Sequence, residues 1–264
     1  MSVFLALTPA ELPSCRALRV PHVHIAYAIG ENGRLMCSGL PRDLRGGLLG
    51  LSDRCRSPLN AVSSPLCRAL TQECLARRFG GVFADFEGEP REDRLAFLSQ
   101  LGAVLERNGR RLFVPERFAV PGAIVLICTA VSGGTLRERL SDACAQYGAQ
   151  SVALDCQRLA MDFLLPCRTG EGTPLTREEL QALLRKSGSP PFFSDELCAN
   201  YFSFQDGGRT HFVLFDTART LLCKLRLGRE RGIETAFFMY PEVDDLLPEL
   251  FPAGASDPSS RGRA

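Results

Sequence analysis

Short apolar segments alternate with segments of helical periodicity along most of this chain, and the alternation restricts the folds that it can adopt. The predicted strands are Val3–Leu7, His22–Ile29, Gly47–Leu51, Gly80–Glu87, Arg111–Pro115, Ala123–Val131, Ser151–Leu154, Leu159–Leu165, His211–Phe215 and Ile233–Tyr240. A strand that is apolar throughout, as Ala123–Val131 is, must be covered on both of its faces. The pattern therefore predicts a parallel sheet with helices packed outside it.

The segments between these strands carry helix signals. Leucines recur on one face of Arg91–Asn108, and Gly109 follows as a stop signal. Thr135 and Thr176 are each followed by a glutamate at the spacing of a capping box. The predicted helices are Pro65–Phe79, Arg91–Asn108, Thr135–Tyr147, Thr176–Lys186 and Thr217–Arg231, the last of them capped by Asp216, and another helix starts at Thr8.

The number of strand–helix units is close to that of a (β/α)8 TIM barrel. An open, doubly wound sheet is the alternative, but such a sheet should carry a glycine-rich turn after its first strand. Thr8-Pro9-Ala10 occupies that position and contains no glycine. We therefore predict an α/β protein with a single compact barrel over residues 1–252 and no large insertion domain. Residues 253–264 are small, polar and rich in Pro and Gly, which predicts a disordered tail.

Composition excludes several classes of function. The net charge is +1 and no basic stripe with interleaved aromatic residues occurs, so we expect no nucleic-acid partner. No apolar run approaches the length of a membrane span, and the segment Met1–Leu7 lacks the basic start of a signal peptide. The eleven cysteines are dispersed without a CxxC pair, which indicates reduced thiols and a cytoplasmic location. His22 and His24 have no third ligand at suitable spacing, so no metal or cofactor is expected.

Two carboxylates lie at the C-terminal end of the predicted strand Gly80–Glu87. Asp85 and Glu87 project from the same strand face because side chains alternate along a strand. Catalytic groups of TIM barrels lie at this end of the strands. Two neighbouring carboxyl groups do not ionise independently, so one of them should have a raised pKa and could serve as a proton donor. The alternative is a pair of solvated acids at the start of a loop.

This strand resembles the signature D-x-x-D-x-D-x-E of the fourth strand in glycoside hydrolase family 18, the chitinase-like barrels. Asp85 and Glu87 match its last two acids. The strand His22–Ile29 and the turn that follows resemble the second strand and turn of that family. The segment from Phe215 to Phe238 is similar to its last helix and eighth strand. The resemblance covers nearly the whole chain in order and spacing.

The sequence also departs from the family pattern. Gly80 and Phe83 stand where the signature has its first and middle Asp. The chain has no tryptophan, and Met239 or Tyr240 occupies the place of the tryptophan usual at the end of the eighth strand. The Tyr-Asp pair of the sixth strand has no clear counterpart, and Asp162 is the nearest candidate.

The resemblance implies a substrate-assisted reaction on glycans that contain N-acetylglucosamine. Glu87 would protonate the glycosidic oxygen, and Asp85 would orient the acetamido group that attacks the anomeric carbon. Tyr240, Glu242, Tyr27 and Asp162 are the further candidate substrate contacts, with Tyr240 as a stacking platform. Because Phe83 removes a partner of Asp85, a catalytically impaired carbohydrate-binding protein is the main alternative. A barrel enzyme of another class, with Glu87 as a base, is a third possibility.

Overall fold

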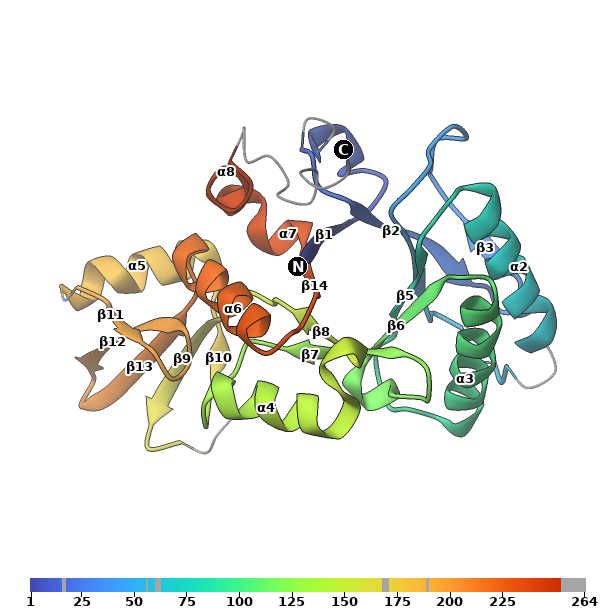
Figure 1. Ribbon diagram of the computed structural model, residues 1–264. Coiled ribbons are helices and arrows are strands. Elements are labelled where there is room, and N and C mark those ends of the chain that lie inside the picture. The colour runs from blue at the N-terminus through green and yellow to red at the C-terminus, as the bar shows by residue number, and fades with distance from the viewer. Residues whose placement is uncertain (16–17, 56, 60–62, 168–170, 189, 253–264) are drawn as a thin grey trace, which may run out of the picture.

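The computed structural model describes residues 1–15, 18–55, 57–59, 63–167, 171–188 and 190–252. The predicted tail lies outside these residues. Eight parallel strands form a closed barrel, because β1 pairs with both β14 and β2 (Figure 1). In their order around the barrel these strands are β1 (Ser2–Leu7), β14 (Thr235–Met239), β8 (Val152–Asp155), β7 (Ile124–Cys128), β6 (Arg111–Pro115), β5 (Gly81–Asp85), β4 (Leu48–Ser52) and β2 (His22–Ile29). The predicted (β/α)8 barrel is confirmed.

Aromatic rings fill the middle of the barrel. The ring of Phe237 lies 4.9 Å from that of Phe83 and 5.1 Å from that of Phe113, measured between centroids. Phe4 stacks on the same ring at 5.3 Å. Side chains alternate along a strand, so the next residue but one after each of these also faces the barrel axis, nearer the opening. The aromatic packing therefore closes the barrel below and leaves the carboxyl ends of the strands to form a cavity.

Helices cover the outside of the barrel through two further apolar clusters. The long helices are α2 (Ser63–Ala76), α3 (Glu92–Arg107), α4 (Leu136–Tyr147) and α6 (Ala218–Glu230), and the short ones are α1 (Leu12–Cys15), α7 (Tyr240–Val243) and α8 (Leu247–Leu250). Within the described residues, 3-10 turns occur at η1 (Glu116–Phe118), η2 (Ala149–Ser151) and η3 (Asp244–Leu246). Thr135 caps α4 as predicted, since its side chain accepts from the backbone N–H of Glu138. The short strand β3 (Leu35–Cys37) pairs antiparallel with β2.

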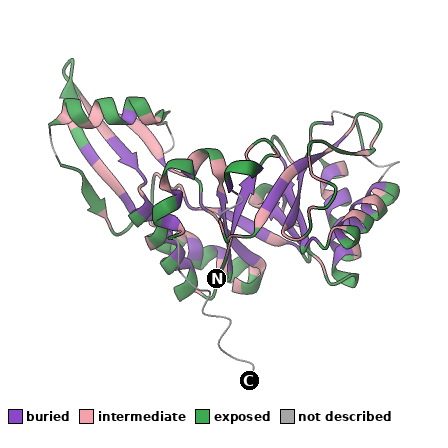
Figure 2. Ribbon diagram, turned by 90° about the horizontal axis from the view of Figure 1, so that it is seen from above, coloured by how far each residue is buried: buried purple, intermediate pink, exposed green. Residues whose placement is uncertain are grey.

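A second sheet interrupts the barrel between its last two strands. Its strands are β9 (Ala160–Leu165), β10 (Thr173–Pro174), β11 (Phe192–Ser194), β12 (Ala199–Asp206) and β13 (Arg209–Phe215), all antiparallel. Helix α5 (Arg177–Ser187) packs on one face of it, and the whole insertion projects from the barrel (Figure 2). The expectation of a barrel without a large insertion is therefore wrong.

The physical reason for the error lies in strand pairing. The sequence predicts strands at residues 159–165 and 211–215. The sequence of one strand does not determine whether its partner strand runs parallel or antiparallel to it. The segment from Asn200 to Gly208 is not among the predicted strands, although it contains a strand and a turn of the insertion. Its polar–apolar alternation followed by Asp206-Gly207-Gly208 is typical of a hairpin strand and its turn. The hairpin of β12 and β13 forms there, with Asp206 opposite Arg209.

A buried ion pair holds the insertion to the barrel. The Nζ of Lys224 donates to Asp216 Oδ2 at 2.7 Å, and both side chains are fully buried. The same carboxylate accepts from the hydroxyl of Thr220 and from the backbone N–H of Leu159. Leu159 directly precedes β9 and Asp216 directly follows β13, so this group joins the two ends of the insertion to α6.

We predict that Asp216→Ala lowers the free energy of unfolding by about 3–5 kcal/mol, because it leaves the Lys224 ammonium buried without its partner. Urea denaturation measures this loss. The matched control is Arg137→Ala, which removes an exposed pair with Glu230 and should change stability by less than about 1 kcal/mol. Equal losses of unfolding free energy in the two variants would contradict the stabilising role of the buried Asp216–Lys224 pair.

Candidate active site

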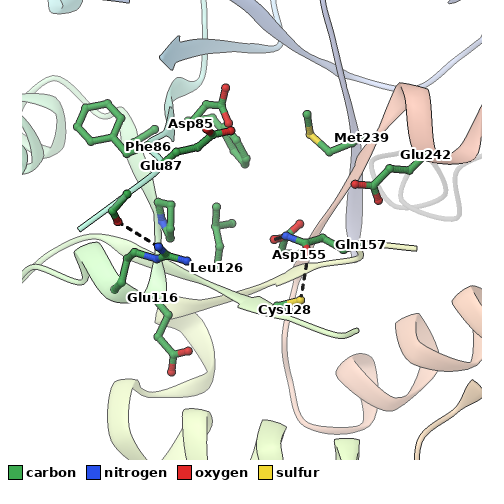
Figure 3. Close-up of a pocket in the computed structure, with 15 residues that line it drawn as sticks. Asp85, Phe86, Glu87, Glu116, Leu126, Cys128, Asp155, Gln157, Met239 and Glu242 are labelled. Atoms are coloured by element: carbon green, nitrogen blue, oxygen red, sulfur yellow. Dashed lines mark hydrogen bonds between the residues drawn. The ribbon is translucent and has the colours of Figure 1, made fainter. Parts of the chain in front are cut away.

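A cavity of about 490 Å³ opens at the carboxyl ends of the barrel strands (Figure 3). Strands β5, β6, β7, β8 and β14 all contribute to its wall, together with the segments that follow them. The wall is rich in carboxylates, which are Asp85, Glu87, Glu116, Asp155 and Glu242. Its apolar part includes Phe83, Leu126 and Met239. The cavity is of the size at which proteins bind small ligands.

Asp85 is the last residue of β5 and follows the interior residue Phe83 by two positions. The hydroxyl of Ser52, at the paired position on β4, donates to Asp85 Oδ2 at 3.0 Å. Burial raises the pKa of Asp85 above its usual value, and the charge of Glu87 raises it further, while the Ser52 hydrogen bond acts in the opposite direction. The raised pKa in this pair therefore falls on Asp85, whereas the residue expected to carry it was Glu87, the candidate proton donor.

Glu87 lies just beyond the end of β5 and is exposed. Its carboxylate lies beside that of Asp85 in the cavity wall (Figure 3). The two acids thus differ in setting, since one is partly enclosed and hydrogen-bonded and the other is open to solvent. A ligand in the cavity could reach both groups at once.

Asp155 was not among the sequence candidates. It ends β8, two positions after the interior residue Ala153. Burial raises the pKa of Asp155 to about 6, with smaller contributions from the charges of Glu242 and Asp85. Gln157 donates to its Oδ2 at 2.8 Å and favours the charged form. The available signal was the one that revealed Asp85, an apolar strand followed by an acid, but the predicted strand stopped one residue earlier.

Glu242 lies in α7 and reaches the cavity as expected. Its Oε2 accepts from the backbone N–H of Arg158 at 2.8 Å, and the Arg158 guanidinium donates to the backbone carbonyl of Glu242. Burial raises the pKa of Glu242, whereas the hydrogen bond and the charge of Arg158 oppose that rise. Glu116 is engaged elsewhere in an ion pair with Arg139.

Tyr240 does not line the cavity. Phe237 and Met239 of β14 face the barrel interior, whereas Tyr240 begins α7 and packs against the outer apolar cluster. Met239 takes the place on the cavity wall that was expected for an aromatic ring.

Tyr27 and Asp162 also lie away from the cavity. The pairing of β2 with β4 shifts register between Ile25 and Tyr27, and this bulge turns Tyr27 outward, where its hydroxyl donates to Glu73 at 2.8 Å. Asp162 lies on β9 of the insertion and forms a hydrogen bond with His211 Nδ1 at 2.8 Å. The register shift of β2 against β4 and the antiparallel pairing of β9 cannot be read from the patterns of the single strands.

No cluster of at least three His, Cys, Asp or Glu side chains suited to a metal ion is found among the described residues. None of the helices in the described part of the chain is long and apolar enough to span a membrane.

The structure is similar to known barrels at low sequence identity. It matches the spore cortex-lytic enzyme SleL of Bacillus cereus with a TM-score of 0.64 and 18% identity, over 95% of this chain and 74% of that one. A chitinase from Chromobacterium violaceum gives 0.64 and 19%, over 92% and 95% of the two chains. A family 18 chitinase mutant from Cycas revoluta, in complex with (GlcNAc)4, gives 0.61 and 12%, over 95% and 98%.

No protein-family model and no curated protein sequence matches the chain. At these identities the structural matches establish the fold. The resemblance to the chitinase-like barrels of glycoside hydrolase family 18 is therefore confirmed as a resemblance in fold.

We predict that Asp155 titrates near pH 6 in the folded protein, well above an ordinary carboxyl group. Replacing Gln157 with Leu should raise this pKa further, because the hydrogen bond to the charged form is lost. Asp85→Asn should lower it, because a neighbouring negative charge is removed. Carboxyl ¹³C NMR titration measures the pKa of Asp155 in the wild type and in both variants. A pKa of Asp155 close to 4 in the wild type would contradict the described burial.

Proposed function

We propose that this protein hydrolyses glycans that contain N-acetylglucosamine, by a substrate-assisted reaction with retention of configuration. The observation that carries the proposal is the position of Asp85 and Glu87, side by side in the wall of a cavity at the carboxyl end of a barrel strand. General acid catalysis needs an accessible carboxyl group, and Glu87 is exposed to the cavity.

In the first step Glu87 donates a proton to the glycosidic oxygen while the carbonyl oxygen of the acetamido group attacks the anomeric carbon. The bond to the leaving sugar breaks and a cyclic oxazolinium ion forms. Asp85 accepts a hydrogen bond from the acetamido N–H and offsets its developing positive charge. Ser52 binds one oxygen of Asp85, which restricts the rotation of the carboxylate and leaves its other oxygen for the substrate.

In the second step the Glu87 carboxylate takes a proton from water as the water attacks the anomeric carbon. The oxazolinium ring opens, the acetamido group is restored and Glu87 regains its proton. Because two displacements occur at one carbon, the product keeps the configuration of the substrate.

Other residues of the cavity replace parts that the family signature would supply. Phe83 occupies the place of the middle Asp, so Ser52 is the side chain that donates a hydrogen bond to Asp85. Asp155 adds a carboxyl group on another strand of the barrel, positioned to contact polar groups of a sugar. Phe83 and Met239 provide apolar surface for a sugar ring.

The names of similar proteins support this substrate class. One is described as a spore cortex-lytic enzyme, and another is a chitinase in complex with (GlcNAc)4. We place the protein in the cytoplasm, as its eleven unpaired thiols suggest. Its substrates would then be glycan fragments that enter the cell or are released there.

A carbohydrate-binding protein without turnover is the second candidate. The observation that favours it is Phe83, whose ring packs against that of Phe237 and cannot form a hydrogen bond with Asp85. Such a protein would use the same cavity for binding alone.

We predict that Glu87→Gln reduces kcat on N-acetylglucosamine oligomers by about 10²–10⁴-fold with little change in KM, because the amide keeps its shape but cannot donate the proton. Asp85→Asn should also lower kcat. The matched control is Glu116→Gln, the same chemical change at a cavity carboxylate already paired with Arg139. The release of reducing ends from chitooligosaccharides and muropeptide glycans measures the activity of the wild type and of the three variants.

Turnover that survives Glu87→Gln would exclude Glu87 as the acid. Binding of the oligomers by the wild type without any cleavage, measured by calorimetry, would select the carbohydrate-binding alternative.

A further inference from the structure

Two cysteines meet where the insertion touches the barrel. Cys198 lies in the turn between β11 and β12, whereas Cys223 lies on α6. The thiol of Cys223 donates to the sulfur of Cys198 at an Sγ–Sγ distance of 3.3 Å. A disulfide bond requires about 2.05 Å, so a shift of about 1.3 Å separates these atoms from bonding distance.

The surrounding structure holds each sulfur in place. Cys198 has a left-handed backbone (φ 49°), and its thiol donates to the carbonyl oxygen of Asp195. The same turn is held to the barrel, because the backbone N–H of Leu136 at the start of α4 donates to the carbonyl of Glu196. Helix α6 is fixed by the buried pair described above. The proximity of the two sulfurs thus follows from anchored backbone on both sides.

The two thiols differ in their access to solvent. Cys198 is only 4% exposed, and burial raises its pKa to about 12, so it keeps its proton at neutral pH. Cys223 is half-buried at the edge of the same apolar cluster. A small oxidant in solution therefore reaches Cys223 first, and Cys198 is in contact with it.

We propose that Cys198 and Cys223 form a reversible, redox-sensitive disulfide that fastens the insertion to the barrel. A hydroperoxide oxidises the Cys223 thiol to a sulfenic acid and is itself reduced to water or an alcohol. The Cys198 sulfur then attacks the Cys223 sulfur, its proton leaves with the hydroxyl group as water, and the S–S bond forms. A dithiol reductant restores both thiols by thiol–disulfide exchange.

The link closes a loop that contains the whole β12–β13 hairpin, the longest pairing of the insertion. Such a link restricts the unfolded chain and any local opening of that hairpin against α6. The oxidised protein should therefore be more resistant to heat, and the hairpin should exchange its amide hydrogens more slowly.

The test uses the full chain with the exposed thiols removed by Cys37→Ser and Cys167→Ser. Treatment with hydrogen peroxide should produce a peptide pair joined through Cys198 and Cys223, with the loss of two hydrogen atoms by mass spectrometry. The Tm should rise by on the order of 5–10 °C and return with dithiothreitol. Hydrogen exchange in β12 and β13 should slow in the oxidised form.

Two variants in the same background are the controls. Cys223→Ser should show neither the joined peptides nor the rise in Tm, while keeping the Tm of the reduced parent protein. Cys144→Ser, on α4, removes another partly buried thiol and should leave the response intact. Accumulation of sulfinic acid on Cys223 without linkage to Cys198 would overturn the proposal. An unchanged Tm and hydrogen exchange in fully linked protein would overturn the fastening role.

Discussion

The closure of the parallel barrel is the constraint on which the rest of this structure depends. Once β1 pairs with both of its neighbours, every strand has one face toward the axis, and the order of side chains along that face is fixed. The aromatic rings around Phe237 occupy the middle of the barrel. Asp85, Asp155 and Met239 are the next inward residues on their strands, so closure alone brings them into one cavity from distant parts of the chain.

Collecting acids in this cavity has an electrostatic cost, and the structure offsets part of it. Burial raises the pKa of Asp85 and Asp155, while Ser52 and Gln157 stabilise their charged forms by hydrogen bonds. Burial and hydrogen bonding thus act in opposite directions on the pKa of each of these two carboxyl groups. In the proposed reaction Asp85 stays charged beside the positive centre, and the hydrogen bond from Ser52 favours that charged form against the rise in pKa that burial causes.

Local patterns predicted the barrel and the pair Asp85 and Glu87, because apolar strands and strand alternation are properties of short segments. Three features depended on pairing between distant segments. The insertion required knowing that β9 and β13 pair antiparallel with each other, and the outward turn of Tyr27 required the bulge against β4. Asp155 required the correct end of β8, where the acid belongs to the strand and not to the following loop.

The substrate-assisted hydrolysis proposed for Glu87 and Asp85 determines the anomeric form of the first product. A ¹H NMR time course of cleavage of a β-linked N-acetylglucosamine oligomer resolves the new reducing end before mutarotation. We expect the β anomer to appear first, because the acetamido group displaces the leaving sugar and water then displaces the acetamido group at the same carbon. Initial release of the α anomer would show direct attack by water and would contradict the roles assigned to both residues.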